Sequence, residues 1–485
     1  MEMALASSLS MTILASGLFL IAFLILQRIA VLNVSRKLPP GNICLPLIGE
    51  TFFFLKRHPA TSVGEFTEHR MTRFGKIFSS HLFGKRSIVC ADPEFNQFVL
   101  KNEVKLFQHS LPPSFEKLVG KHSILLMDGD VHKHMRSTVL DFLCVERLRT
   151  VFLSDADRLA SEIVNSWNEK DVISAIQEAT KFSLNIMVKK LLSMNPGDPE
   201  VERLSIEYNS LTRAFSCFPV YIPGTTYWKA MQSRNHIIKI FKQEMEARMR
   251  GGGCRNAGNE EDDFLGWLMK NTDYSQEKIS DFLLGQLFAG HKTISQAISL
   301  LIYFLQTCPK AVSELREEHL QVVRSNQHLG DSKLSWDDFK RMEFTRCVIN
   351  ETLRLGNIVR FAMKKASKSF EYKDYVIPKG STVLLHYAAG HLDPCQYADP
   401  EHFNPWRWQL QPGIIKVPDS FMPFSKGIRM CPGAELARLE MTVFLHHLIL
   451  KFDWQMAEDD HPVATPILEF PKGLPIKIRA VSNGF

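Results

Sequence analysis

One stretch near the C-terminus decides how this chain folds: Phe424-Ser425-Lys426-Gly427-Ile428-Arg429-Met430-Cys431-Pro432-Gly433. It places Cys431 between two glycines, shortly before an amphipathic run at 435–450 that predicts a helix. Gly427 permits a tight backbone turn, and Pro432 suits the first position of a helix. We therefore expect Cys431 at a helix N-terminus, where free N–H groups and the helix dipole favour a thiolate.

The neighbours of this cysteine suit a flat ligand with an apolar face and anionic edges. A buried, inert thiol is the usual role of a single cysteine, but it explains neither the glycines nor the arginine. The spacing F-x-x-G-x-R-x-C-x-G has Phe424, Gly427, Arg429, Cys431 and Gly433 at its fixed positions. It resembles the haem-binding signature of the cytochrome P-450 monooxygenases. The resemblance implies a mainly α-helical fold with small β-sheets, and haem b (iron protoporphyrin IX) with Cys431 as the axial iron ligand.

Charge and cysteine content indicate which cellular compartment and which partners suit the protein. The 485 residues include 58 Lys and Arg against 52 Asp and Glu. No long basic block is present, so we expect no nucleic acid partner. The nine cysteines are scattered without a C-x-x-C pair, which favours neither a disulfide framework nor a zinc site. This pattern indicates a reducing compartment for the bulk of the protein.

The N-terminal residues predict a membrane anchor. Residues 3–27 carry no charge and 13–26 are almost wholly apolar, whereas a transmembrane helix needs about 20 apolar residues. A cleaved signal peptide is the alternative, but it has a shorter apolar region and an early positive charge. Positive charge instead follows the run, at Arg28, Arg36 and Lys37. The positive-inside rule therefore places the rest of the protein in the cytosol.

A stiff, non-helical joint is predicted after this run by Leu38-Pro39-Pro40-Gly41. It resembles the proline-rich hinge of microsomal P-450 enzymes. We expect three segments: an endoplasmic-reticulum signal anchor with one transmembrane helix at 1–28, a basic, proline-rich hinge at 29–44, and a P-450 catalytic domain facing the cytosol at 45–485.

Periodicity and turn residues predict the elements of the catalytic domain. Helices are expected at 63–74, after the N-cap Asp92-Pro93, at 129–142, through most of 145–250 with a break at 217–227, and at 275–307 and 344–355. Strands are expected at 76–82, 87–91, 369–377 and 381–385, and as short pieces within 452–478. We expect 107–126 to be irregular and 251–263 to be a surface loop.

The predicted helix at 275–307 is apolar over much of its circumference and should be buried. A glycine inside a helix costs about 1 kcal/mol relative to alanine. Gly290 therefore indicates either close helix packing or a local opening beside a ligand.

The same helix contains Ala289-Gly290-His291-Lys292-Thr293. This segment resembles the oxygen-activating motif A/G-G-x-D/E-T of P-450 enzymes, in which the threonine hydroxyl assists dioxygen activation. Ala289, Gly290 and Thr293 match, but Lys292 stands where the family usually has an acid. Because an ammonium accepts no hydrogen bond, a proton relay through that acid cannot operate unchanged.

Two further patterns are weak on their own and are interpreted through the resemblance. His132 and Arg136, four positions apart, share a helix face. Alone, such a pair is most often a solvated face. In many P-450 enzymes it is Trp and Arg, both directed at a haem propionate. The resemblance implies that role for Arg136 and, as a departure from the family, for His132.

Glu351 and Arg354 match the family's E-x-x-R, a weak pattern on its own. Arg407 matches the arginine that completes a buried Glu–Arg–Arg network in the family. We expect this network to maintain the fold around Cys431 rather than to take part in catalysis.

These signals occur in the family's order and span nearly the whole sequence. The resemblance implies a haem-thiolate monooxygenase that inserts one atom of O2 into a C–H bond. It also implies NADPH-derived electrons from a separate NADPH–cytochrome P-450 reductase. The acidic surface of that reductase is complementary to Lys133, Lys426 or Arg429.

Several longer stretches carry a closer resemblance. They are Ile222-Pro223-Gly224-Thr225, Gln232-Ser233-Arg234, 308–312, 350–357, 403–409 and 435–440. They resemble plant steroid hydroxylases of brassinosteroid biosynthesis, especially the C-22 hydroxylases. The resemblance implies a sterol or steroid substrate of the campesterol or campestanol type, hydroxylated at C-22, a carbon of its aliphatic tail.

Alternatives stay open at this stage. Related plant enzymes oxidise triterpenes, abscisic acid or cholesterol-derived saponin precursors. Lys292 motivates two others: a haem-binding isomerase or dehydratase acting on an oxidised lipid, and a non-enzymatic haem or sterol binder. Thr293 argues against the isomerase.

Overall fold

The computed structural model describes residues 37–41, 49–217, 219–251, 263–328, 333–411, 414–415, 417–465 and 467–481. The expected anchor at 1–28 and most of the expected hinge lie outside these residues. Across the described ranges, none of the helices combines the length and the apolar character needed to cross a bilayer.

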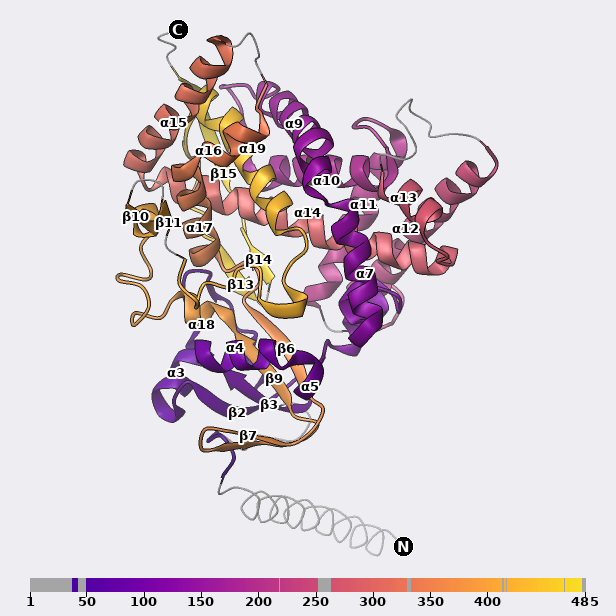
Figure 1. The fold of residues 1–485 in the computed structure, drawn as a ribbon, viewed down its shortest axis with the longest axis vertical. Helices are drawn as coiled ribbons and strands as arrows, with labels where there is room; N and C mark the ends of the chain where they lie inside the picture. Colours follow the sequence, from indigo (N-terminus) through magenta and orange to yellow (C-terminus); the bar gives the residue numbers. More distant parts are fainter. Residues whose placement is uncertain are drawn as a thin grey trace, which may run out of the picture.

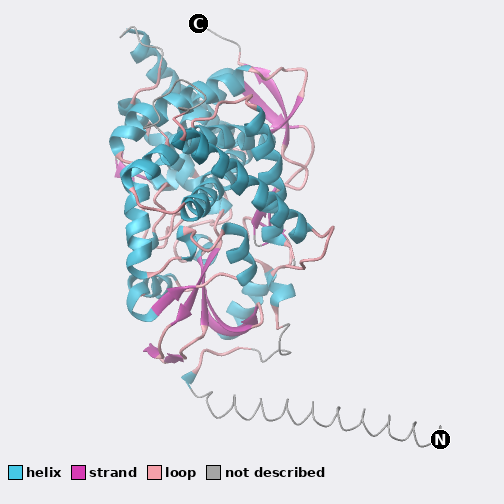
Figure 2. Cartoon of the chain, turned by 90° about the vertical axis from the view of Figure 1, so that its right-hand side faces the viewer, coloured by secondary structure: helices cyan, strands magenta, loops and turns pink. Residues whose placement is uncertain are grey.

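Helices make up most of the described residues, as the sequence predicts (Figures 1 and 2). The first half contains α2 (Thr51–Phe54), α3 (Glu65–Phe74), α4 (Pro93–Lys101), α5 (Glu103–Leu106), α6 (Pro113–Val119), α7 (Gly129–Phe142), α8 (Val145–Arg147), α9 (Leu153–Asn165), α10 (Ala175–Leu192), α11 (Pro199–Arg213) and α12 (Thr226–Met249). The second half contains α13 (Phe264–Asn271), α14 (Gln276–Gln306), α15 (Pro309–His328), α16 (Trp336–Arg341), α17 (Glu343–Gly356), α18 (Tyr387–His391) and α19 (Ala434–Lys451). Short 3-10 or π turns lie at Ile124–Leu126, Leu148–Phe152, Ala214–Ser216, Pro405–Trp408 and Gly427–Arg429.

The strands form small sheets. The five-stranded sheet has the order β2 (Ile77–Leu82), β3 (Lys85–Cys90), β9 (Thr382–His386), β6 (Phe361–Ala366), β4 (Phe107–His109). Three-stranded sheets contain β1 (His58–Pro59), β13 (Val463–Thr465) and β14 (Ile467–Glu469), and β12 (Phe452–Met456), β15 (Pro475–Ala480) and β5 (Val172–Ser174). Two-stranded sheets pair β7 (Phe370–Tyr372) with β8 (Tyr375–Ile377) and β10 (Gln409–Gln411) with β11 (Ile414–Ile415).

Local sequence accounts for the hairpin and the helix that follows it. Phe83 and Gly84 have φ of 53° and 72°, and they form the two-residue turn that joins β2 to β3. The predicted hairpin is therefore confirmed. The Asp92 carboxylate accepts a hydrogen bond from the Glu94 N–H, and Pro93 opens α4, so the predicted N-cap is confirmed as well.

Three predictions of secondary structure are wrong in part. The expected strand at 369–377 is a hairpin, because Lys373 takes a φ of 50° and turns β7 back into β8. The expected irregular segment at 107–126 contains β4 and α6. The helical stretch 145–250 is interrupted by β5, which adds to the edge of β15. Distant partners explain β4 and β5, which pair with β6 and β15, whereas β7 and β8 pair with each other across a local turn.

The helices and the larger sheet occupy different ends of the molecule. Figure 1 shows the five-stranded sheet at the lower end, beside α3 and α4, with most helices above it. The long helix α14 crosses the helical part and packs against α10, α12, α17 and α19. Its leucines, including Leu283, Leu300 and Leu305, are fully buried. The prediction that this helix is buried is confirmed.

Candidate functional site

The cysteine loop is closed by its own backbone. The Cys431 N–H donates to the Phe424 carbonyl at 2.9 Å, and the Met430 N–H donates to the Gly427 carbonyl at 3.1 Å. Gly427 has a φ of 73°, and a Cβ there would lie 2.9 Å from the Leu100 carbonyl oxygen. Glycine is thus required at 427 by both conformation and space.

The start of the following helix differs from the prediction. Helix α19 begins at Ala434 with Gly433 as its N-cap, so Pro432 precedes the helix instead of opening it. The hydrogen bond from Cys431 to Phe424 closes the loop before helical geometry begins. Gly433 takes a φ of −88°, which any residue adopts, and a Cβ there would lie 3.9 Å from the Cys431 Sγ.

The loop by itself does not favour a thiolate. Burial raises the pKa of the Cys431 thiol above its ordinary value, and the Gly433 N–H, Arg136 and Arg438 oppose that shift only in part. Burial therefore outweighs the expected effect of the helix N-terminus. A metal cation on the sulfur would reverse this balance, since coordination deprotonates a thiol.

Helix α7 brings two predicted residues beside the cysteine loop. The Arg136 guanidinium donates to the Met430 carbonyl. His132 is buried, and burial followed by Arg429 and Arg136 lowers its pKa to about 4. The imidazole is therefore neutral at physiological pH and retains one N–H donor.

Arg429 belongs to a group of polar and charged side chains, here called the Arg429 cluster: Arg429, Glu103, Lys364 and His109, with Asp128 at its exposed edge. The Arg429 Nε lies 2.7 Å from a Glu103 carboxylate oxygen, and its Nη2 lies 2.5 Å from the Asp128 carboxylate. Lys364 forms an ion pair with Glu103. The sequence analysis identified only Arg429, because its partners come from α5, β6 and the loop before α7.

His109 is the unpaired member of this cluster. It lies opposite Lys364 where β4 pairs with β6. Neither buried ring nitrogen has a hydrogen-bond partner among the described residues. Burial, then Lys364 and Arg429, lower its pKa to about 3. A neutral imidazole with free nitrogens beside two cations fits a ligand that carries anionic oxygens.

Four of the five residues of the α14 motif are half-buried or exposed, whereas His291 is buried. Ala289 is exposed, and Lys292 and Thr293 are partly exposed. The Thr293 hydroxyl donates to the Ala289 carbonyl at 2.6 Å. A Cβ on Gly290 would lie 2.3 Å from the Met187 Sδ of α10. The helix is continuous here, so the structure supports close packing as the reason for Gly290.

Lys292 has no acceptor within hydrogen-bonding distance among the described residues. Burial lowers the pKa of its ammonium, and the Glu469 carboxylate partly opposes that shift. Glu469 itself pairs with Arg57 at 3.2 Å. His291, the neighbour of Lys292, faces elsewhere: its Nδ1 lies 2.9 Å from the Ser183 hydroxyl of α10.

The structure brings Glu351, Arg354 and Arg407 into one network, here called the Glu351 cluster. The carboxylate accepts two hydrogen bonds from Arg354, at 2.9 and 2.8 Å, and one from the Arg407 Nε at 3.0 Å. It also accepts from the Trp408 indole N–H at 3.0 Å and the Asn404 backbone N–H at 2.9 Å. The sequence analysis missed these last two donors.

These residues fit the cofactor that the sequence implies. The Cys431 sulfur suits a haem iron, and the neutral histidines and cations near Cys431 and Arg429 suit the anionic carboxylates of a haem. Across the described part of the protein, no hydrogen bond or ion pair joins this set to Ala289, Lys292 or Thr293. Those residues remain a separate group on α14.

Comparison with known proteins gives a consistent result. The cytochrome P450 family model matches residues 39–477. A cholesterol 22-hydroxylase of Paris polyphylla is 47% identical over 454 residues, covering 93% of each sequence. A steroid (22S)-hydroxylase of Oryza sativa subsp. japonica is 48% identical over 449 residues, covering 92% of this chain and 89% of its own. The solved structure of cyanobacterial CYP120A1 with bound retinoic acid superposes with a TM-score of 0.81 at 25% identity, covering 92% of this chain and all (100%) of that one.

Proposed function

This chain belongs to the cytochrome P450 family of monooxygenases, and we propose on that premise that it hydroxylates a plant sterol or steroid at C-22, a carbon of the aliphatic tail. The observation that carries the proposal is the identity of 47% and 48%, over more than nine-tenths of this chain, to two enzymes named for 22-hydroxylation. We further propose a campesterol- or campestanol-type substrate in brassinosteroid biosynthesis, from the resemblance of the sequence to that branch. The isomerase and the non-enzymatic binder are not favoured, because these relatives are hydroxylases.

We assign haem b as the cofactor and Cys431 as its axial ligand. When bound, thiolate-ligated haem supplies the activation of O2 and the insertion of one oxygen atom into a C–H bond. Arg136, His132 and His109 would hold the two propionates by hydrogen bonds and charge. Arg429, which is already paired with Glu103 and Asp128, would add its charge to the same side of the site. Phe424, Gly427 and Gly433 shape the loop that presents the sulfur.

On the other side of the site we assign Thr293 as the residue that holds a proton near the reacting oxygen, at its Oγ1. The hydroxyl now donates to the Ala289 carbonyl, so it must rotate to donate elsewhere. Lys292 replaces the usual acid, and burial makes its ammonium a better proton donor than an ordinary lysine. The Glu469 carboxylate partly opposes that shift, and we assign it as the acidic residue near Lys292.

The family implies electrons from a reductase, and we propose that NADPH–cytochrome P-450 reductase is the donor. Lys133 is exposed on α7, next to His132, and suits an acidic partner surface. Arg429, in contrast, is occupied by Glu103 and Asp128. Lys426 is likewise paired, with Asp419 at 3.0 Å, so Lys133 is the residue that we assign to reductase docking.

We propose a signal anchor at 1–28 and a hinge at 29–44 that hold the catalytic domain on the cytosolic face of the endoplasmic reticulum. The uncharged run at 3–27 supports this. The family match begins at residue 39, directly after that run and its basic residues. The apolar residues Val220, Tyr221 and Ile222, exposed between α11 and α12, suit a lipid-facing position.

Expression in microsomes with a plant reductase tests the proposal. We expect the reduced carbon-monoxide complex to have the Soret band of a thiolate-ligated haem, and campesterol, campestanol or cholesterol to give a 22-hydroxylated product by mass spectrometry. A spectrum without that band would contradict the ligation by Cys431. A normal spectrum with oxidation at another carbon would contradict only the C-22 assignment.

A further inference from the structure

A cavity of about 320 Å³ lies away from the cysteine loop. Its wall consists of residues between Phe53 and Glu68, from the end of α2 to the first turn of α3, together with Arg360, Phe361 and His386. Phe361 and His386 belong to the five-stranded sheet, and Arg360 directly precedes it. It shares no lining residue with the cysteine loop, the Arg429 cluster or the α14 motif. Its volume is at the lower end of the range of small-molecule sites.

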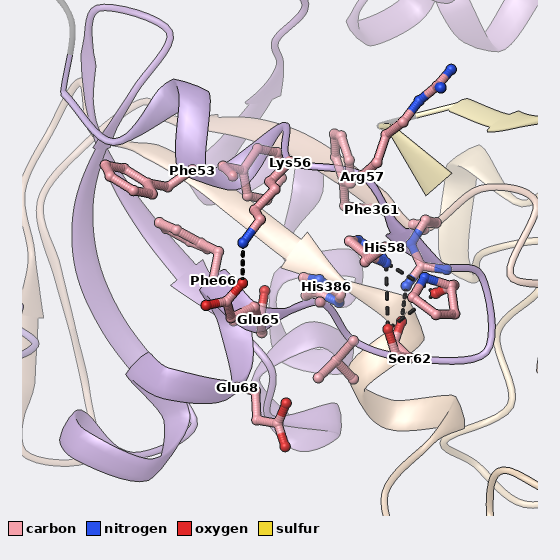
Figure 3. A pocket seen from close by; sticks show the side chains of 16 residues that line it. Phe53, Lys56, Arg57, His58, Ser62, Glu65, Phe66, Glu68, Phe361 and His386 are labelled. Carbon is pink, nitrogen blue, oxygen red and sulfur yellow. Dashed lines mark hydrogen bonds and ion pairs between the residues drawn. The ribbon is translucent and has the colours of Figure 1, made fainter. Parts of the chain in front are cut away.

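The wall has an aromatic part and a polar part. Figure 3 shows Phe53 and Phe66 toward one end, and His58, His386 and Ser62 toward the other. Phe54 and Phe361 add further aromatic surface. A ligand that fills this cavity must therefore combine an apolar body with a polar end.

The polar end contains a buried cation without a counter-ion. Arg360 is 4% exposed and donates to the carbonyls of Ala60 and Ser62. No carboxylate among the described residues forms an ion pair with it, and burial alone lowers its pKa to about 10. The other cations of the wall are already paired: Lys56 with Glu65 at 2.5 Å, and Arg57 with Glu469 at 3.2 Å.

His386 adds a neutral donor to the same end. It is 3% exposed, and burial followed by Arg360 lowers its pKa to about 3. Its Nδ1 accepts a hydrogen bond from the Ala389 N–H at 3.2 Å. A hydrogen bond to the residue's own backbone also acts on the ring. With Nδ1 as the acceptor from Ala389, the Nε2 N–H is the remaining donor. Arg360 and His386 together leave donors for an oxyanion. The carboxylates of the wall belong to Glu65, which is paired with Lys56, and to Glu68, which is exposed on α3.

We propose that this cavity binds an amphipathic oxyanion, a carboxylate or phosphate joined to an aliphatic tail. The oxyanion lies at Arg360 and His386, because a guanidinium without a counter-ion gains most from an anionic partner. The tail lies along Phe53, Phe54 and Phe66. Two sources share this chemistry: a free fatty acid and the head group of an anionic phospholipid. The site is independent of the proposed hydroxylation.

Equilibrium dialysis of the full-length holoenzyme against labelled laurate tests the proposal. We expect saturable binding of laurate, and binding of 1-dodecanol, which has the same aliphatic tail without the charge, that is at least tenfold weaker. A saturating steroid keeps laurate out of the haem pocket, and an unchanged Soret band verifies this. Equal binding of laurate and dodecanol would overturn the oxyanion assignment.

Neighbouring phenylalanines provide a matched pair of variants. Phe53 is 67% exposed and lines the cavity, whereas Phe52 is 58% exposed and does not line it. We expect Phe53→Glu to weaken laurate binding at least tenfold, since a carboxylate at the mouth repels the anion, and Phe52→Glu to change it less than twofold. Equal laurate affinity in both variants and the parent would overturn the assignment of laurate binding to this cavity. Arg360→Gln removes the cation directly, but its loss of two carbonyl contacts affects folding, so the exposed pair decides the test.

Vesicles distinguish the two sources. If phosphatidylglycerol vesicles displace laurate and phosphatidylcholine vesicles do not, the ligand is a lipid head group. If neither displaces it while laurate still binds through Phe53, the ligand is a free acid. Absence of saturable binding to both laurate and phosphatidylglycerol would overturn the proposal.

Discussion

Two polar clusters of this molecule differ in how completely their buried groups are paired. In the Glu351 cluster, both carboxylate oxygens accept hydrogen bonds from guanidinium, indole and backbone donors. In the Arg429 cluster, both His109 nitrogens and one Glu103 oxygen have no hydrogen-bond partner within the described ranges. Since unpaired buried polar groups are costly, a saturated cluster stabilises the fold by itself, whereas an unsaturated one fits a ligand.

The largest effect is expected from breaking the saturated cluster. Glu351→Gln leaves two buried guanidiniums without their carboxylate, which costs about 3–5 kcal/mol. We expect little or no folded protein, measured as the yield of soluble protein and by urea unfolding. Glu435→Gln is the control, because Glu435 is half-exposed and its pairs with Lys340 and Arg438 span 3.4 and 3.6 Å. Similar stability of the two variants would contradict a structural role for the cluster.

A second effect concerns Glu440 of α19, which is buried with both carboxylate oxygens unpaired among the described residues. Burial raises its pKa to about 8. Between its ordinary value of 4.5 and about 8, the folded protein therefore binds more protons than the unfolded protein. Stability must fall as pH rises through this range, by at most about 1.4 kcal/mol per pH unit.

Glu440→Gln should remove this dependence. We expect the variant to be more stable than the parent at pH 8, with a smaller difference at pH 6, by urea unfolding at each pH. A stability difference that does not change with pH would show that Glu440 is ionised in the folded protein.

The unsaturated cluster is tested at His109. His109→Leu removes two unpaired nitrogens, so we expect the stability of the haem-free protein to stay the same or rise slightly. We expect haem retention, measured as the ratio of Soret to protein absorbance during dialysis, to fall about tenfold, the effect of roughly 1.4 kcal/mol. His134→Leu, at an exposed position of α7, should change neither quantity. Destabilisation of the haem-free protein without loss of haem retention would contradict the assignment of the unpaired His109 nitrogens to ligand binding.

The smallest effect is expected at Lys292, whose ammonium is half-buried and has no acceptor within the described part. Lys292→Met should stabilise the protein by on the order of 1 kcal/mol. Lys278→Met on the same helix should destabilise it slightly, because the Lys278 ammonium lies 3.3 Å from the centre of the Tyr274 ring. Thermal unfolding of both variants measures the difference. A larger loss of stability in Lys292→Met than in Lys278→Met would indicate a partner for the Lys292 ammonium.

Local sequence patterns predicted the elements that are held by contacts between residues close together in the sequence. The turn at Phe83-Gly84, the N-cap at Asp92 and the bounds of α7 follow from short stretches of sequence. The cysteine loop is similar, since Gly427 and the hydrogen bond from Cys431 to Phe424 lie within eight positions of one another. Prediction failed at the hairpin β7–β8, where a non-glycine residue adopts a positive φ.

The sequence alone determined the family, the mainly helical fold and the pairing of Glu351 with Arg354, because their signals are short-range spacings. A short-range spacing is also the basis for proposing Cys431 as the haem ligand. Tertiary structure alone decided the rest of the site. His109 reaches Lys364 only through the pairing of β4 with β6, and Arg429 finds Glu103 more than 300 positions away. The tertiary structure also determines the pKa of the Cys431 thiol, which depends on burial more than on the helix that follows it. Burial and long-range pairing are properties of the packed protein, and no local spacing encodes them.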